Sequence, residues 1–187
     1  MATLSPSDAG PCLRRRGFAI WFTGLPSSGK TTAAREVGHL FLARGVLVQL
    51  LDSDALRRKL TPQPRYTTSE RDGFYKVLVF LAGFLTDHGL NVLIAATGSR
   101  RAYRLAARER MPRFAEVYVH CPPAVCRERD PKGLWARADR GEIDNLPGAN
   151  APYEAPLDPE VLVDTASLSL QAAARRILAQ LERQRFF

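Results

Sequence analysis

The chain has 187 residues, of which 45% are hydrophobic and 25% charged, as is usual for a globular protein. This length suits one α/β domain and is short for two, so we expect a single domain, residues 18–187, behind a flexible tail, residues 1–17. The net charge of +8 favours an anionic partner. Because no zinc-ligand spacing, aromatic RNA-binding signature or helix-turn-helix pattern is present, we expect a small anionic substrate rather than nucleic acid.

Cysteine spacing and hydropathy bear on the compartment. Cys12, Cys121 and Cys126 are odd in number and lack the spacing of a metal knuckle or a redox pair, and the three histidines show no metal-ligand spacing. The default expectation is therefore a reducing, cytoplasmic setting. No stretch approaches the length of a membrane span, so no membrane contact is expected.

The first elements form a strand, a loop and a helix. Residues 18–23 are an apolar run that predicts a buried strand, and residues 32–44 carry apolar side chains at helical spacing. Residues 24–32 between them match the pattern G-x-x-x-x-G-K-[ST], whose glycines let successive backbone N–H groups turn toward an anion at the positive end of the helix. We predict that this phosphate loop binds ATP through Gly24, Leu25, Pro26, Ser27, Ser28, Gly29, Lys30, Thr31 and Thr32.

Two of these residues have specific roles in the pattern. Lys30 is expected to reach the β- and γ-phosphates and to act in catalysis, and the Thr31 hydroxyl is expected to ligate Mg²⁺.

Two carboxylates follow the second predicted strand, residues 46–51. Because ligands in open α/β sheets lie beyond the carboxyl ends of strands, Asp52 and Asp54 should lie near the phosphate loop. We predict Asp54 as the general base for an acceptor hydroxyl and Asp52 as an indirect holder of Mg²⁺. The two carboxylates are separated by one residue on a segment that we expect to be extended, and they need not have the same role.

The next segments carry cations that suit an anionic acceptor. A short helical piece, residues 55–60, contains Arg57, and a loop leads through Arg71 into a helix that Thr67 or Thr68 caps and Gly89 ends. Arg57 and Arg71 are predicted to orient the acceptor through paired hydrogen bonds. Spacing alone favours equally that Arg57 is a charged residue on the helix surface with no role in binding.

The second half of the chain completes the pattern. Strands are predicted at residues 91–96, 116–121 and 161–164, and a closing helix at residues 169–184. Six arginines oppose one acid in a predicted helix, residues 100–113, which we interpret as a solvated face where only Arg100 and Arg101 are placed to touch substrate. Residues 127–156 hold few aliphatic side chains and many charges, so a mobile lid that adds little core is expected there.

Reaction class follows from these parts together. No guanine-reading Asn-Lys-x-Asp motif is present, which argues against a switch GTPase, and a motor-type ATPase would need a longer chain. A donor site, an acceptor base, cations and a lid are the parts of a small-molecule kinase.

At this point the chain resembles the adenylylsulfate kinase family. The resemblance rests on the phosphate loop, on Leu51-Asp52-Ser53-Asp54-Ala55-Leu56-Arg57 and Glu70-Arg71, and on segments 129–135, 140–143, 152–156 and 164–165. It implies a P-loop nucleotide-kinase-like three-layer fold with a five-stranded parallel sheet and a lid, a homodimer, and phosphorylation of the 3′-hydroxyl of adenosine 5′-phosphosulfate by MgATP. It also implies that Arg129 and Lys132 of the lid lie over ATP and that Asp54 is the base.

The departures from the family pattern lie on the acceptor side. Tyr66 keeps an aromatic side chain for stacking, whereas Leu146 replaces a second stacking ring; both are predicted to contact the acceptor. The other changes are at Ala55, Arg65, Phe74, Gly98 and Asp144, with Ser99 displaced by one position from a family serine. A kinase for another anionic nucleotide, such as a cytidine diphosphoramidate, and a nucleotide-binding subunit without turnover therefore stay open.

Overall fold

A computed structural model of the chain describes residues 16–187. Five parallel strands form one sheet in the order β2-β3-β1-β4-β5. Their bounds are β1 Ala19–Thr23, β2 Val48–Asp52, β3 Asn91–Ala95, β4 Phe114–His120 and β5 Val161–Asp164. This confirms the predicted α/β fold with a five-stranded parallel sheet. Most of the predicted tail lies outside the described residues, but Gly17 is fixed by a hydrogen bond of 2.9 Å from its N–H to the Thr86 carbonyl.

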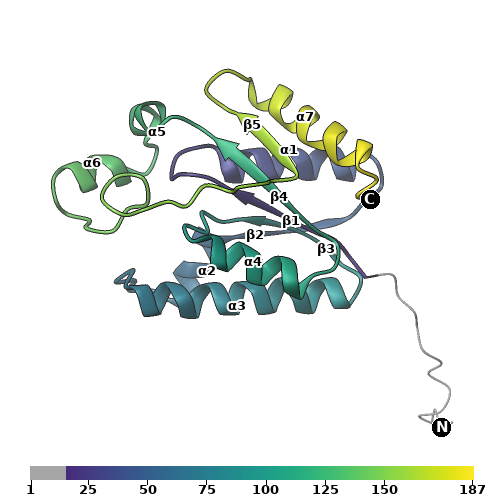
Figure 1. Cartoon of the computed structure of the whole chain (residues 1–187), viewed down its shortest axis with the longest axis horizontal. Coiled ribbons are helices and arrows are strands. Elements are labelled where there is room, and N and C mark those ends of the chain that lie inside the picture. The colour runs from purple at the N-terminus through teal and green to yellow at the C-terminus, as the bar shows by residue number, and fades with distance from the viewer. Residues whose placement is uncertain (1–15) are drawn as a thin grey trace, which may run out of the picture.

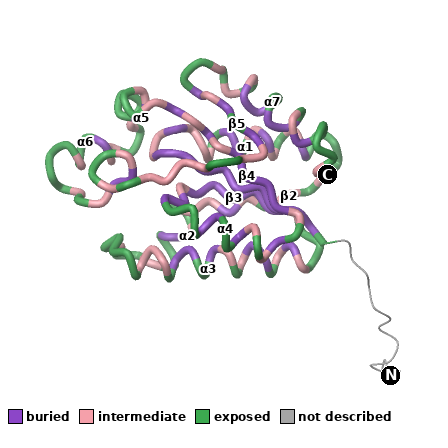
Figure 2. The backbone as a smooth tube through the Cα atoms, in the orientation of Figure 1, coloured by how far each residue is buried: buried purple, intermediate pink, exposed green. Residues whose placement is uncertain are grey.

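Helices cover both faces of the sheet, giving three layers (Figure 1). On one face lie α1 and α7, and on the other α2, α3 and α4. The helix bounds are α1 Lys30–Leu42, α2 Ser53–Leu60, α3 Thr68–Asp87, α4 Arg101–Arg110, α5 Pro123–Arg129, α6 Leu134–Asp139 and α7 Leu170–Arg183. The central strands are buried on both sides, as Figure 2 shows, because each face is covered by apolar helix surfaces. Among the described residues, no helix is long and apolar enough to cross a membrane.

Several element boundaries differ from the predictions in ways that affect the site. Helix α2 begins at Ser53 rather than Ala55, because the Asp52 carboxylate accepts hydrogen bonds from the N–H groups of Asp54 (2.9 Å) and Ala55 (3.2 Å) and so caps the helix. Asp54 therefore stands in the first turn of a helix and not on an extended segment. Strand β4 begins at Phe114, two residues before the predicted start. The cap of α3 is Thr67, one of the two predicted residues.

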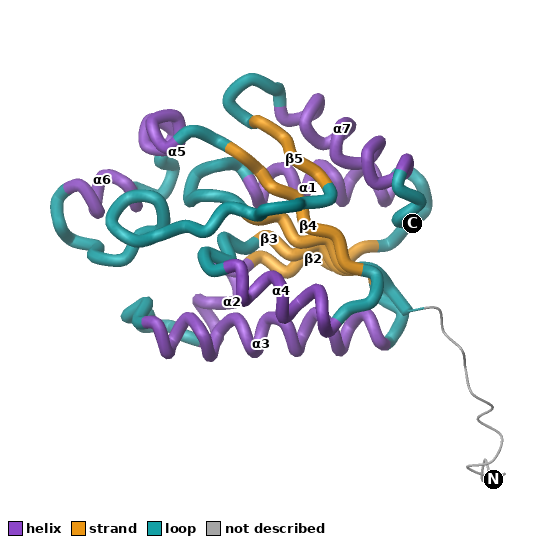
Figure 3. Tube along the Cα trace, in the orientation of Figure 1, coloured by secondary structure: helices purple, strands orange, loops and turns teal. Residues whose placement is uncertain are grey.

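The segment predicted as a lid contributes two side chains to a small hydrophobic cluster. Trp135 is fully buried and Leu146 nearly so, and both pack with Leu25 in a hydrophobic cluster separate from the two that cover the sheet. The segment adds no residue to the two clusters that cover the sheet, which confirms the expectation that residues 127–156 contribute little core. From α6 the chain returns to β5 as one long loop, shown in Figure 3.

Candidate functional site

A cavity of about 600 Å³ lies at the carboxyl ends of the strands. The phosphate loop after β1, Ser53 after β2, Thr97 after β3 and Thr165 after β5 all line it. Such a position is where open α/β sheets bind their ligands. It also collects most of the residues predicted for the site: Pro26, Ser27, Gly29, Lys30, Thr31, Thr32, Asp54, Arg57, Tyr66, Arg71, Arg129, Lys132 and Leu146.

Four predicted site residues do not line the cavity. Gly24, Leu25 and Ser28 are buried residues of the phosphate loop itself, and Leu25 joins the cluster around Trp135. Asp52 is occupied as the cap of α2 through one carboxylate oxygen. These residues support the cavity wall instead of forming it.

The phosphate loop owes its shape to backbone angles that favour glycine. Gly24 has φ 154°, Ser27 φ 67° and Gly29 φ 89°. A Cβ on Gly24 would lie 2.4 Å from the Val119 carbonyl oxygen, so no side chain fits there, whereas Gly29 faces open space and is required for its angle alone. The N–H groups at the start of α1 thus remain available to an anion.

Lys30 lies folded back on the loop. Its Nζ donates a hydrogen bond of 2.6 Å to the Leu25 carbonyl oxygen. Burial lowers the pKa of Lys30 from its ordinary value to about 8, an effect that the nearby Asp54 charge opposes in part. The ammonium is therefore held in a poorly solvated position where an anion would stabilise its charge.

Asp54 and Lys132 form an ion pair across the mouth of the cavity. Both side chains are about half exposed. Asp54 comes from α2 and Lys132 from the turn before α6, so the pair joins the predicted base to the predicted lid. In this arrangement Lys132 contacts the carboxylate that sequence reasoning assigned to the acceptor.

Arg129 is tied to the opposite edge of the cavity. Its Nη2 donates to the Thr165 carbonyl (2.6 Å) and its Nη1 to the Thr165 hydroxyl (3.3 Å). That hydroxyl also lies 2.9 Å from the Ser28 carbonyl oxygen, to which it can donate. Arg129 is thereby linked through Thr165 to the backbone of the phosphate loop.

On the acceptor side, Arg71 binds carbonyl groups. Its Nε donates to the Tyr66 carbonyl (3.0 Å) and its Nη2 to the Asn145 carbonyl (2.6 Å), while the Asn145 side-chain amide donates back to Tyr66 (3.0 Å). Burial lowers the pKa of Arg71. Tyr66 has a left-handed φ of 55°, a strained value for a residue with a side chain, and this mutual clamp holds it there.

Arg57 lines the cavity but is only 7% exposed. It is therefore not the surface charge that spacing alone left open. Of the acceptor-side departures, Ala55, Arg65 and Asp144 are exposed and none of the three lines the cavity, whereas Leu146 does. The negative charge of Asp144, which would repel an anionic acceptor, is therefore not part of the cavity wall. Ser99, displaced by one position from the family serine, is 7% exposed and does not line the cavity either.

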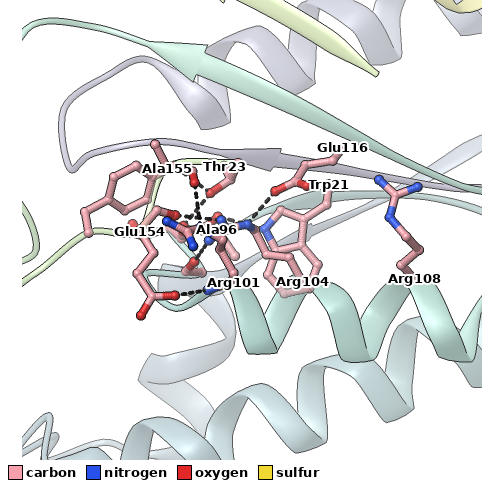
Figure 4. Close-up of polar contacts among 12 residues, drawn as sticks. Trp21, Thr23, Ala96, Arg101, Arg104, Arg108, Glu116, Glu154 and Ala155 are labelled. Carbon is pink, nitrogen blue, oxygen red and sulfur yellow. Dashed lines mark hydrogen bonds and ion pairs between the residues drawn. The ribbon is translucent and has the colours of Figure 1, made fainter. Parts of the chain in front are cut away.

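The arginine-rich helix is a structural anchor, which corrects its interpretation as a solvated face. Arg104 is 2% exposed, pairs with Glu116, and donates to the carbonyls of Gly98 and Glu154 (Figure 4). Arg101 donates from its backbone to the Glu154 carboxylate (2.8 Å) and from its side chain to the Ala155 carbonyl (2.9 Å). Neither arginine lines the cavity.

These contacts fix the return segment, which we define as residues 152–160. Arg108 forms two hydrogen bonds with the Glu160 carboxylate at 2.6 and 2.8 Å, so arginines of α4 hold the segment at both ends. The Tyr153 hydroxyl lies 3.0 Å from that of Thr23, the last residue of β1 before the phosphate loop. The end of the predicted lid is thus bound to the sheet.

Trp135 of α6 joins another part of the predicted lid to the phosphate loop. Its Nε1 donates a hydrogen bond of 3.2 Å to the Pro26 carbonyl oxygen. Because Pro26 lines the cavity, this hydrogen bond connects α6 directly to the cavity wall.

Sequence reasoning missed several residues of the cavity wall. Among them are Tyr75, Thr97, Asn145 and Thr165. Thr97 and Thr165 directly follow strands, and this placement rule could have identified them as wall residues. Tyr75, whose hydroxyl accepts a hydrogen bond of 2.9 Å from the Gly98 N–H, had no comparable signal in the sequence.

The sequence is similar to those of known proteins. The sequence profile described as adenylylsulphate kinase matches residues 16–164. An adenylyl-sulfate kinase from Halothermothrix orenii is 39% identical over 168 residues, which cover 90% of this chain and 91% of the relative. One from Deinococcus deserti is 38% identical over 180 residues, covering 96% and 97%.

Solved structures agree. The Mycobacterium tuberculosis APS kinase CysC in complex with AMPPNP and APS matches with a TM-score of 0.83 and 33% identity, covering 89% of this chain and 98% of that one. The hexameric APS kinase from Thiobacillus denitrificans matches with a TM-score of 0.69 and 27% identity, covering 93% of this chain and 30% of that one.

Proposed function

The chain belongs to the adenylylsulfate kinase family, and from this premise we propose that it phosphorylates the 3′-hydroxyl of adenosine 5′-phosphosulfate with ATP. The products are 3′-phosphoadenosine 5′-phosphosulfate and ADP. One observation carries the proposal: a single cavity brings Lys30 of the phosphate loop, the Asp54 carboxylate and the Arg57 guanidinium together. These are a donor site, an acceptor base and a cation for an anionic acceptor.

In the proposed reaction, the acceptor oxygen attacks the γ-phosphorus of ATP as the bond to the β-phosphate oxygen breaks. Asp54 accepts the proton of the attacking hydroxyl. Lys30 neutralises charge on the transferring group, and its depressed pKa fits a group that gains stability when a phosphate arrives. Because Lys132 pairs with Asp54, it must exchange this partner for ATP phosphate oxygens before the carboxylate can act as a base.

We propose Mg²⁺ as the cofactor. The ion prefers oxygen ligands and is usually held by one or two protein groups together with substrate phosphates and water. Thr31 lines the cavity and offers a hydroxyl ligand, so the residues here fit such a site. Asp52, whose Oδ1 caps α2, would hold the ion indirectly. Residues 16–187 contain no group of three or more His, Cys, Asp or Glu side chains that could hold a metal ion. When bound, the ion neutralises charge on the phosphates.

The decisive experiment measures ADP release with a panel of acceptors. Adenosine 5′-phosphosulfate should support turnover, while adenosine 5′-phosphate and cytidine diphosphate analogues should not. Turnover with a cytidine compound and none with adenosine 5′-phosphosulfate would assign the chain to the alternative acceptor. ATP binding without turnover on any of them would favour the non-catalytic subunit.

We propose a homodimer as well. The outer stripe of α3 is apolar where a solvent-facing helix is usually charged: Val77, Phe80 and Phe84 are 45%, 67% and 49% exposed. One structural relative is described as hexameric. A Phe80→Glu variant should shift the mass measured by light scattering from dimer to monomer, and a wild-type monomer would contradict the proposal.

Three remaining assignments are proposals of the same kind. Residues 18–187 would form one domain, supported by the single sheet that both main hydrophobic clusters cover. Residues 127–156 would act as a lid, supported by the contacts of Lys132 and Trp135 with the site. A cytoplasmic location is supported by the free thiols of Cys121 and Cys126, whereas Cys12 lies outside the described residues.

A further inference from the structure

The Arg57 guanidinium is held in an aromatic surrounding. Its Cζ lies 3.7 Å from the centre of the Phe74 ring, and the rings of Tyr66 and Tyr75 follow at 5.3 and 5.8 Å. Arg57 comes from α2, whereas Phe74 comes from α3. A nearly buried cation of one helix therefore rests on the aromatic face of another.

No carboxylate among residues 16–187 lies within hydrogen-bonding distance of the Arg57 guanidinium. Glu70 is the acid paired with Arg57, but its Oε1 lies 3.9 Å from Arg57 Nη1, which is too far for a hydrogen bond. Both atoms are buried and lack a hydrogen-bond partner among residues 16–187. A ring face attracts a guanidinium through its quadrupole, and the attraction is larger when the cation is desolvated.

Phe74 itself does not reach a ligand in the cavity. It is 4% exposed and is absent from the cavity wall, whereas Arg57 is part of that wall. Phe74 can therefore affect a ligand only through its neighbours in the wall, which are the uncharged Tyr75 ring, with its centre 5.5 Å from that of Phe74, and the Arg57 cation that an anion would contact.

We propose that Phe74 is a positioning residue for the acceptor. Its ring holds the Arg57 guanidinium in place, so that the cation is already ordered when the 5′-phosphosulfate group of the acceptor arrives. Ordering a side chain before binding lowers the entropic cost of binding. This inference rests on the proposed function, because it takes adenosine 5′-phosphosulfate as the acceptor.

The test compares Phe74→Leu with a matched control, Phe114→Leu. Phe114 is 6% exposed, belongs to the same hydrophobic cluster, and also carries an arginine, Arg108, whose Cζ lies 5.1 Å from the ring centre. Neither Phe114 nor Arg108 lines the cavity. In Phe74→Leu, the acceptor KM should rise about tenfold, while kcat and the KM for ATP stay near the wild-type values. Phe114→Leu should leave all three unchanged.

A second series separates electrostatics from packing. Mono-, di- and trifluorinated phenylalanines at position 74 weaken the negative face of the ring stepwise with little change of shape. The acceptor KM should rise in the same steps, which a purely structural role for the ring would not produce.

Two results would overturn the inference. One is an acceptor KM that is unchanged in Phe74→Leu and across the fluorinated series, in an enzyme that turns over adenosine 5′-phosphosulfate. The other is a fall in kcat and a rise in both KM values that are equal in the two leucine variants, which would mean a general packing defect. No turnover of adenosine 5′-phosphosulfate by the wild-type enzyme would instead defeat the proposed function, and this inference with it.

Discussion

The two sides of the cavity are built by different means. On the phosphate side, the loop backbone determines the shape, and its carbonyl groups accept hydrogen bonds from Lys30, Trp135 and Thr165. On the acceptor side, side chains form the wall. The Arg57 guanidinium rests on the Phe74 ring, and the Arg71 guanidinium donates to the carbonyls of Tyr66 and Asn145. Nine consecutive residues form the phosphate loop, although Trp135 and Thr165, which bind its carbonyl groups, lie 109 and 137 positions away. The acceptor side has no such continuous segment, because Arg57 and Arg71 contact Phe74 and Asn145, 17 and 74 positions further along the chain.

The largest effect should come from the residue where the two sides meet. Asp54→Asn removes the base without a large change of shape, so kcat should fall by about 10²- to 10⁴-fold while ATP binding is retained. Asp139→Asn is the matched control, because Asp139 is also a half-exposed carboxylate paired with a lid cation, Arg127. ADP release measures turnover and calorimetry measures ATP binding. Full activity of Asp54→Asn would remove Asp54 from the mechanism.

The backbone side can be tested by adding one methyl group. In Gly24→Ala, the new Cβ would meet the Val119 carbonyl at 2.4 Å in a backbone conformation that alanine rarely adopts. The free energy of unfolding should fall by about 3 kcal/mol or more. Gly45→Ala is the control, since Gly45 has a φ of 72° but faces open space, and it should cost only about 1 to 2 kcal/mol. Equal urea midpoints of the two variants would contradict this account.

The charge state of Lys30 should appear in the pH dependence. Only the protonated amine attracts phosphate, so kcat/KM for ATP should fall about tenfold per pH unit above the pKa of about 8. Bound phosphates raise this pKa, so kcat at saturating ATP should stay level to higher pH. A Lys30→Arg variant keeps its charge, and its lower activity should not show the decline. A wild-type profile without a decline up to pH 10 would contradict the assignment.

The same shift has a definite sign for stability. The pKa of Lys30 is lower in the folded chain, about 8, than the ordinary value of 10.5, so the cost of burying the ammonium is present in full below about pH 8. Between these values the unfolded chain binds more protons, and the contribution of Lys30 to stability rises with pH.

The smallest effect should come from a single side chain on the acceptor side. Asn145→Ala removes the amide that donates to the Tyr66 carbonyl at 3.0 Å and to the Arg65 carbonyl at 3.3 Å. The acceptor KM should rise about fivefold, as the loss of a net hydrogen bond predicts, with the KM for ATP unchanged. Glu142→Ala, an exposed change in the same segment, is the control. If both KM values moved together in Asn145→Ala, the two sides would not be independent.

Sequence reasoning succeeded where the determining contacts are local. The phosphate loop, the five strands and the position of Asp54 follow from periodicity and from the rule that ligands lie beyond strand ends. Arg104 was misjudged because its partners Glu116 and Glu154 lie 12 and 50 residues away, and nothing near it indicates burial.

The expectation that the lid adds little to the core was confirmed, but the residue that anchors it was not predicted. Counting aliphatic residues gives no weight to one large aromatic side chain, and Trp135 is fully buried against the phosphate loop. Phe74 was noted only as a departure from a family pattern, and its contact with Arg57 requires α2 and α3 to be packed together.

The contact between Trp135 and Pro26 gives the protein an optical reporter of its own. The chain has two tryptophans, and the other, Trp21, is buried in β1 with its indole N–H bonded to the Ala96 carbonyl at 3.0 Å. Indole emission depends on the polarity and hydrogen bonding around the ring, so Trp21 supplies a constant background while Trp135 senses whether α6 rests on the phosphate loop. The intrinsic fluorescence of a Trp21→Phe variant therefore follows that contact alone, in real time and without a label.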